Sequence, residues 1–589
     1  MKRKFFQAAL IALSLLATIK ILFFGLGIDE EYAVTMAYRM ASGDRMFLDM
    51  WEPHQTSGFL AAALVRIFLA LTGGTEYLVL YLRAAGALIQ GLISVFLYRT
   101  LKRSFSPDAS FVAAVFFFNT LPKWIQTPEF SNMLVWFSVL MMLCFLRYYL
   151  GGSQKKKWLV LAALSMCGLV LSYPSCILAV PVVLLCMRMA DRRRFLKEAG
   201  IVAVICTAAG LLYLAYFLSH MSVADFLFGL KQMMTDASHS AGVMERLAAY
   251  ASEAVTLLPH VLISLGLTGL IVLIFRKVRS LSFFCLLVIC LAQAQQCIIW
   301  FGPSRYIHFP LVYFYILYGT GAAVYLHVPS YGRGRRFPGS DAASLPRPLT
   351  VLFWMGTVTG GAVWLSGLLI TNTTISVTGS YLMTGLVSAI VILGECCFSG
   401  TTVSMSDDTG ISAGPDAPAS VSVPDGGTIT APLRILSFLA ALCLLGTTLF
   451  AKGLLMCENE GVKNNITYVR QKALSGPAKG IYYRYMEGYG YNSFASLAPQ
   501  YIENGDSVLY VGQNTLFYVL CGQTISAYST ISTPVFDERL KEYWELHPER
   551  YPDVIIVDTG YTGEASLDKL LKLNGPAAEA EGIEIYLTE

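Results

Sequence analysis

The sequence predicts a polytopic α-helical membrane protein of about 13 transmembrane helices, with two interfacial helices after the first span and a small C-terminal α/β domain. Three observations lead to this fold class. Apolar residues make up 55% of the 589 residues and charged residues only 14%, unlike a soluble protein. The apolar residues form runs of membrane-spanning length. From about Cys457 onward, the composition becomes that of a soluble domain.

The first apolar run, 5–27, follows the basic residues Lys2, Arg3 and Lys4. It is long enough to span a bilayer and has no small-residue cleavage site, so we interpret it as a retained helix. Because basic residues favour the cytoplasmic side, we expect the N-terminus in the cytoplasm. The acidic residues that follow this run then emerge at the outer surface.

Two short helices are expected to lie in the outer membrane interface next. Tyr32, Met36 and Met40 recur every four residues and form one apolar stripe. The second stretch, 57–71, is only about fifteen residues long and carries Arg66 in its middle. If it crossed the membrane, each later basic cluster before the C-terminal domain would lie outside, against the usual bias.

The complete set of candidate spans places every basic cluster between spans on the cytoplasmic side. The runs are 5–27, 77–98, 108–122, 131–150, 157–172, 174–189, 199–218, 256–275, 281–300, 306–327, 349–370, 381–398 and 433–454.

Four parts follow along the chain. They are a transmembrane core at 1–399, a flexible linker at 400–432, the last span at 433–456 and an extracytoplasmic α/β domain at 457–589. In that domain, strands are predicted at 507–512, 554–558 and 583–587, with a helix at 536–547.

Cysteine and histidine spacing gives no sign of a metal site, so we expect neither a metal nor a cofactor, while recruitment of a divalent metal by a pair of carboxylates stays open. Most of the 13 cysteines lie in or beside apolar runs. Only Cys457 and Cys521 lie in the C-terminal domain, where a disulfide between them stays open. The net charge of +4 is small, and we expect no nucleic-acid partner.

The segment from Ile28 to Leu60 resembles the first outer loop of the C-type glycosyltransferases, above all the protein O-mannosyltransferases and the lipid A aminoarabinose transferases. That loop has an Asp-Glu pair, a Tyr-containing helix, a Gly-Asp turn and a Lys- or His-Pro-Pro segment. The matching residues are Asp29-Glu30, Tyr32, Gly43-Asp44 and Pro53-His54. Gln55-Thr56-Ser57 replaces the Pro-Pro pair. The resemblance covers roughly the first 330 residues and is specific mainly in this loop.

The resemblance implies an enzyme that moves a sugar from a polyprenyl-phosphate carrier to an acceptor on the outer face of a bacterial cell membrane. Such a transfer needs a base for the acceptor proton and a cation for the departing phosphate. The sugar, the oligomeric state and the acceptor (glycan, lipid, wall polymer or protein) stay open. The alternatives are a transporter or flippase of lipid-linked sugars, or an envelope-assembly protein. The sequence lacks the internal repeats typical of transporters.

Three carboxylates are candidates for catalysis. Asp29 occupies the acidic position of the family motif, and desolvation at a membrane boundary can raise a carboxylate pKa into the range of a useful base. Its alternative role is to stabilise the start of the interfacial helix. Glu30 is a second candidate. Glu129 stands where related enzymes carry an acidic residue, and its alternative role is again to stabilise the start of the helix that follows it. Lys123 and Lys231 are outer-side cations of lower rank.

The resemblance also implies residues that bind the substrate. His54 stands where relatives carry Lys or His near the donor phosphate, Trp51 is suited to stack on a sugar ring, and Gln55 to bind hydroxyls. Arg305 and Tyr306 resemble an Arg-Tyr pair of related transferases. A guanidinium there can hold a phosphate bidentately, or it can snorkel to the interface.

Overall fold

Apolar helices dominate the computed structural model, which describes residues 2–151, 155–234, 242–274, 281–301, 318, 347–369, 375, 377–398, 431–456, 466–484, 490–531, 536–559 and 575–588. By length and composition, eight helices in the described part are able to cross a membrane. The protein is therefore a multi-pass helical membrane protein, as predicted. The count of thirteen spans stays a prediction, because the candidate span 306–327 lies almost entirely outside the described residues.

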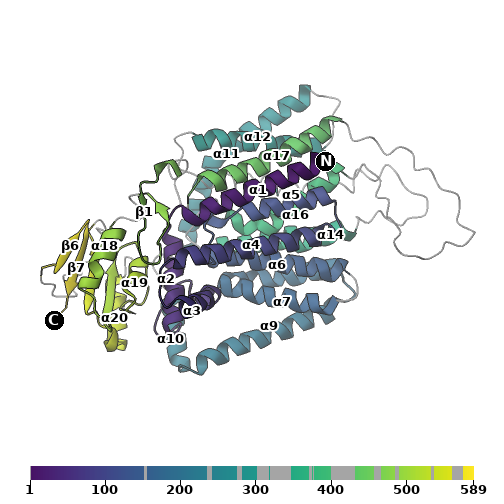
Figure 1. The fold of residues 1–589 in the computed structure, drawn as a ribbon. Coiled ribbons are helices and arrows are strands. Elements are labelled where there is room, and N and C mark those ends of the chain that lie inside the picture. Colours follow the sequence, from purple (N-terminus) through teal and green to yellow (C-terminus); the bar gives the residue numbers. More distant parts are fainter. Residues whose placement is uncertain are drawn as a thin grey trace, which may run out of the picture.

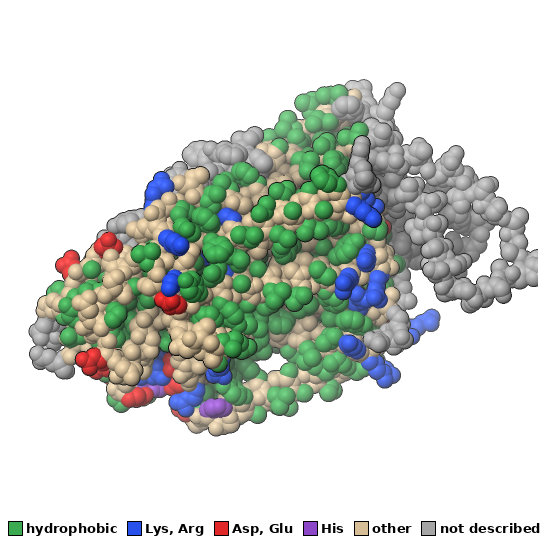
Figure 2. Space-filling view, in the orientation of Figure 1, with side chains coloured by type: hydrophobic (Ala, Val, Ile, Leu, Met, Phe, Trp, Pro, Cys, Tyr) green, Lys and Arg blue, Asp and Glu red, His purple; other side chains and the backbone are tan. Residues whose placement is uncertain are grey.

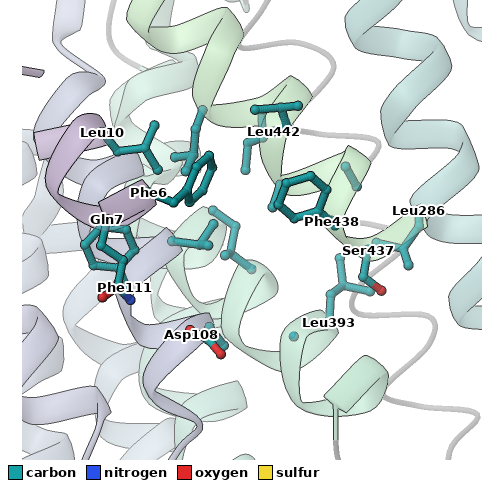
Figure 3. A pocket seen from close by; sticks show the side chains of 18 of the residues that line it. Phe6, Gln7, Leu10, Asp108, Phe111, Leu286, Leu393, Ser437, Phe438 and Leu442 are labelled. Carbon is teal, nitrogen blue, oxygen red and sulfur yellow. The ribbon is translucent and has the colours of Figure 1, made fainter. Parts of the chain in front are cut away.

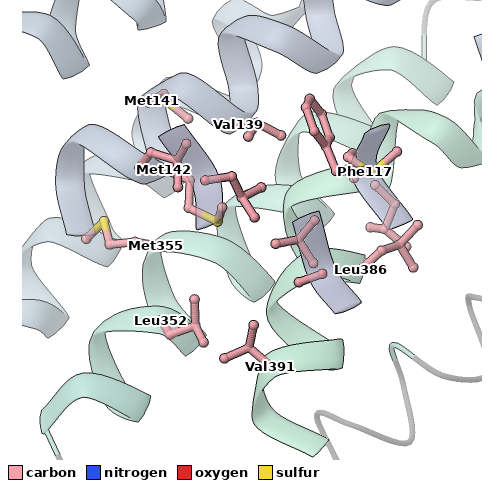
Figure 4. Packing of buried hydrophobic residues seen from close by; sticks show 14 of the residues in the cluster. Phe117, Val139, Met141, Met142, Leu352, Met355, Leu386 and Val391 are labelled. Atoms are coloured by element: carbon pink, nitrogen blue, oxygen red, sulfur yellow. The ribbon is translucent and has the colours of Figure 1, made fainter. Parts of the chain in front are cut away.

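Long and short apolar helices lie side by side in one bundle (Figure 1). They are α1 (Lys2–Phe23), α4 (Leu78–Leu101), α5 (Pro107–Asn119), α6 (Phe130–Leu150), α7 (Lys155–Ser172), α8 (Val180–Ala190), α9 (Phe195–Leu218), α11 (Val243–Ile274), α12 (Leu281–Phe301), α14 (Arg347–Leu352), α15 (Thr359–Leu368), α16 (Met383–Phe398) and α17 (Ala431–Leu454). In the middle of the bundle, Met142 of α6 packs among Phe117, Leu386 and Val391, which are all fully buried (Figure 4). The bundle core is thus continuous through helices that are distant in sequence.

The surface of the bundle separates into an apolar band and a basic end (Figure 2). Apolar side chains are exposed along its length, as expected of helices that face lipid. Leu88, Leu92 and Leu212 are among the exposed apolar residues. Arg103 and Arg193 are exposed, in the connections that follow α4 and precede α9. These ends of α4 and α9 lie far from the sheet (Figure 1). We call the other end, where the sheet lies, the sheet end.

Two further helices, α2 (Ile28–Ser42) and α3 (Phe59–Thr72), lie at the sheet end, between the bundle and the sheet (Figure 1). The predicted stripe of Tyr32, Met36 and Met40 packs on Met50 and Ala62. All residues of α2 from 30 to 40 are buried. The sequence predicted an interfacial stripe, but protein covers α2 on all sides, because the C-terminal region packs on the face opposite the bundle.

The C-terminal region contains a five-stranded sheet in the order β4-β3-β5-β7-β6. Its strands are β3 (Ser507–Val511), β4 (Thr524–Ile525), β5 (Val554–Asp558), β6 (Ala578–Ala580) and β7 (Ile583–Leu587). β3 runs parallel to β4 and β5, and β7 is antiparallel to β5 and β6. This region also contains a hairpin of β1 (Gln471–Lys472) and β2 (Tyr482–Tyr483) and the helices α18 (Tyr491–Leu497), α19 (Leu516–Cys521) and α20 (Phe536–Leu546).

The three predicted strands are present, while the division of the chain into four domains stays a prediction. Most of the linker 400–432 lies outside the described residues. Cys521 is a free thiol, and Cys457 is also outside the described part, so their disulfide is not tested.

Candidate active site

Asp29 and Lys123 form an ion pair at the sheet end of the bundle. Asp29 lies in the first turn of α2, and Lys123 lies in the short 3₁₀ helix η2 (Pro122–Trp124). Lys123 and Trp124 have φ angles of 50° and 57°, in the left-handed region that residues other than glycine rarely adopt. This backbone turns the ammonium group of Lys123 toward Asp29. The pair is partly accessible, since the Asp29 side chain is 26% exposed.

Glu129 lies close by, at the N-cap of α6. Its carboxylate accepts hydrogen bonds from the backbone N–H groups of Ser131 (2.8 Å) and Asn132 (2.6 Å). Burial raises the pKa of Glu129 from 4.5 to about 7, although the positive charge of Lys123 lowers it. Glu129 therefore caps a helix and also changes its charge near neutral pH.

Replacing Glu129 with Gln is expected to make thermal stability less dependent on pH. Folding raises the Glu129 pKa, so its contribution to stability is fully present below the unfolded value and is lost as the pH rises through about 7. Gln cannot ionise, so from about pH 5 to pH 8 the melting temperature of the variant should rise relative to wild type. Thermal scanning of both proteins measures this, with Glu545→Gln, a change at an exposed residue of α20, as the control. A constant offset between Glu129→Gln and wild type would contradict the prediction.

Glu30 forms a buried ion pair with Arg83 of α4. The carboxylate of Glu30 is fully buried and accepts a hydrogen bond from Arg83 Nε at 2.8 Å and a further one from Thr127. Arg83 also donates to the backbone carbonyls of Ile21 and Leu22 at the end of α1. Glu30 therefore joins α1, α2, α4 and the segment before Glu129, and this position suits a structural support better than a base.

His54 lies near Lys123, because both side chains contact the ring of Phe130. Its ring stacks on Phe130 with centroids 3.9 Å apart and planes 6° apart. The ring of Tyr173 also lies near His54, with 5.9 Å between the two ring centroids. Lys123 Nζ lies 4.9 Å from the centroid of the same Phe130 ring. Phe130 thus fixes His54 and Lys123 relative to each other.

Trp51 and Gln55 do not line an open space. The Trp51 ring is 1% exposed and lies between Tyr528, at 5.6 Å, and Tyr543, at 5.4 Å between centroids. Gln55 is fully buried and its side-chain oxygen accepts a hydrogen bond from the N–H of Phe47. Gln55 Nε2 has no hydrogen-bond partner among the described residues, but it is buried. The predicted roles in stacking on a sugar and in binding its hydroxyls do not fit this placement, because neither side chain reaches an open space.

Two predicted substrate-binding residues, Arg305 and Tyr306, lie outside the described residues. Within the described ranges, no group of three or more His, Cys, Asp or Glu side chains is placed to hold a metal ion.

A separate cavity of about 650 Å³ lies among α1, α5, α12, α16 and α17 (Figure 3). It is lined mainly by apolar side chains, among them Phe6, Leu10 and Phe438. Arg3 and Asp108, which pair at 2.6 Å, also line it, so it opens at the end far from Asp29. The cavity therefore contains none of the predicted site residues.

Residues 56–222 match the family model described as dolichyl-phosphate-mannose-protein mannosyltransferase. The protein resembles the C-type glycosyltransferases. The matched segment contains Lys123, Phe130 and Glu129, whereas Asp29 and His54 lie before it. No curated protein matches the chain at a significant level.

Two solved structures show a distant likeness to this one. ArnT from Cupriavidus metallidurans bound to undecaprenyl phosphate is 12% identical, with 98% of this chain and 97% of that chain covered and a TM-score of 0.47. The archaeal oligosaccharyltransferase AglB from Archaeoglobus fulgidus, in complex with an inhibitory peptide and a dolichol-phosphate, is 13% identical. The alignment with AglB covers 95% of this chain and 70% of that chain, with a TM-score of 0.45.

Proposed function

We propose that the protein is a membrane glycosyltransferase that moves a sugar from a polyprenyl-phosphate donor to an acceptor on the outer face of a bacterial cell membrane. The observation that carries this proposal is the contact between Asp29 and Lys123. It places a carboxylate and a cation side by side at one end of the bundle, and glycosyl transfer from a lipid phosphate needs both groups. The family match supports the class of donor.

Each group has a defined part in the transfer. The acceptor oxygen forms a bond to the anomeric carbon of the sugar while the bond from that carbon to the phosphate oxygen breaks. The Asp29 carboxylate takes the acceptor proton, and the lipid phosphate leaves with the electron pair. The ammonium of Lys123 balances the charge on that phosphate, with Arg305 as a further proposed partner. Glu129 and His54 set the charge and the shape around Lys123.

The charge distribution supports the proposed orientation. Exposed Arg103 and Arg193 lie in connections at the end far from the sheet, and positive connections favour the cytoplasm. The sheet end, with Asp29 and the C-terminal region, then lies outside. The N-terminus lies in the cytoplasm in this arrangement.

The proposal is tested by reconstituting the full chain in liposomes with labelled polyprenyl-phosphate sugars and envelope fractions as acceptors. We expect release of polyprenyl phosphate together with transfer of label to an acceptor. Movement of intact donor across the bilayer without release of polyprenyl phosphate would instead show a transporter.

Replacing Lys123 with Met is expected to weaken donor binding and slow transfer, by about ten- to a thousand-fold in kcat/KM, because the departing phosphate loses its cation. Lys156→Met, which removes an exposed lysine at the other end of the bundle, is the matched control. Steady-state kinetics at several donor concentrations measure the effect. Unchanged kinetics in folded Lys123→Met would remove Lys123 from the mechanism.

A further inference from the structure

The loop that leads to His54, residues 44–56, is attached to the C-terminal region at its first residue. The carboxylate of Asp44 receives two hydrogen bonds from the guanidinium of Arg550, at 2.7 Å and 3.1 Å. It also pairs with Arg39 of α2. The side chains of Asp44 and Arg550 are only 15% and 12% exposed. A bidentate pair that is largely shielded from water holds its partners in one geometry more firmly than a surface pair does.

The same loop is attached a second time at Glu52, two residues before His54. Glu52 is fully buried and accepts hydrogen bonds from Ser529 Oγ (2.7 Å) and from the N–H of Thr530 (2.8 Å). Arg39 Nη1 lies 3.6 Å from the same carboxylate. A buried carboxylate is costly unless such partners surround it, so the C-terminal region is required for this loop conformation.

Between these two attachments, Trp51 and Asp49 also bind the C-terminal region. The N–H of Trp51 donates to the carbonyl of Tyr528 at 2.8 Å, and the Tyr543 hydroxyl donates to the carbonyl of Asp49 at 2.7 Å. On the far side of Glu52, His54 stacks on Phe130 of the bundle. The loop therefore connects the C-terminal region directly to the neighbourhood of Lys123.

We infer that the C-terminal region positions His54 and the Asp29–Lys123 site by holding Asp44 and Glu52, and so acts on the transfer step itself. This inference rests on the proposed function. Arg550 and Ser529 are positioning residues in this arrangement, because they touch the loop and act through it. A region that served only to recruit the acceptor would need no buried contacts to the loop that carries His54.

Positioning of the site and recruitment of the acceptor predict different kinetics and different hydrogen exchange of the loop. Arg550→Met keeps much of the side-chain volume and removes the guanidinium. We expect kcat to fall about ten- to a hundred-fold, as for a small displacement of a catalytic group, while the KM for acceptor stays within about twofold. Hydrogen exchange of amides 44–56, followed by mass spectrometry, should become faster. Ser529→Ala should act in the same direction with a smaller effect, and Arg550→Lys should restore only part of the activity, since Lys lacks the bidentate fork.

The control is Lys541→Met, which removes an exposed cation from α20 of the same region. It should leave both kcat and exchange unchanged. The inference is overturned if Arg550→Met and Ser529→Ala raise the acceptor KM with unchanged kcat and unchanged exchange of the loop. If Arg550→Met fails to fold, the milder Ser529→Ala decides. If the wild-type protein transfers no sugar, the proposed function fails, while the exchange measurement still tests the attachment of the loop.

Discussion

Asp29→Asn is expected to abolish turnover while donor binding stays largely intact. The substitution keeps the size of the side chain and removes the group that accepts the proton. Loss of a general base typically lowers the rate about a hundred- to ten-thousand-fold. The amide still accepts a hydrogen bond from Lys123, so that the cation stays near the donor phosphate. Transfer kinetics and direct binding of the donor, measured on the same preparation, separate the two effects.

The matched control for Asp29→Asn is Glu76→Gln. Glu76 also pairs with a lysine, Lys479, but its side chain is 55% exposed. Exposed ion pairs contribute little, about 0–1 kcal/mol, so this variant should retain activity. Wild-type turnover by a folded, membrane-inserted Asp29→Asn protein would refute the role of Asp29 as the base.

Arg83→Met is expected to have the largest effect on stability. Arg83 is the partner of buried Glu30 and also binds carbonyl groups at the end of α1. Its removal leaves a carboxylate buried without its cation, which typically costs about 3–5 kcal/mol. The effect is measurable as a lower melting temperature and earlier aggregation of the protein in detergent.

A second substitution distinguishes a lost charge partner from lost packing. Glu30→Gln combined with Arg83→Met removes both charges, so the double variant should recover part of the stability. Arg3→Met is the control, because its pair with Asp108 is exposed and should contribute less than about 1 kcal/mol. If the double variant were no more stable than Arg83→Met, the pairing of charges would not explain the loss.

Hydropathy predicts the membrane helices well, because each signal lies within one segment. The runs 77–98, 131–150 and 199–218 coincide closely with α4, α6 and α9. Ends are less predictable: α11 begins at Val243, although its apolar run starts at 256. The run 174–189 is a 3₁₀ turn, Pro174–Ala179, followed by α8, because proline removes a backbone donor.

Most contacts of the candidate site cannot be predicted from sequence patterns. Position and family motif predict Asp29 as a site residue. Its partner Lys123 is 94 residues away, and the direction of the Lys123 side chain depends on a left-handed backbone. Trp51 has the kind of aromatic side chain that often binds sugars, yet its ring stacks on Tyr528, which comes from the far end of the chain. Such pairings arise from tertiary packing, which local periodicity does not encode.

The attachment of Glu52 to Ser529 also has a consequence for biosynthesis. The two residues are separated by 477 positions, and Asp44 and Arg550 by 506. At roughly 5–20 residues per second, the ribosome needs on the order of a minute to make the second partner after the first. During that time the loop has no Ser529 or Arg550 to bind, and its carboxylates must stay hydrated at the membrane surface. The segment next to the first helix to be inserted is thus among the last to reach its final conformation.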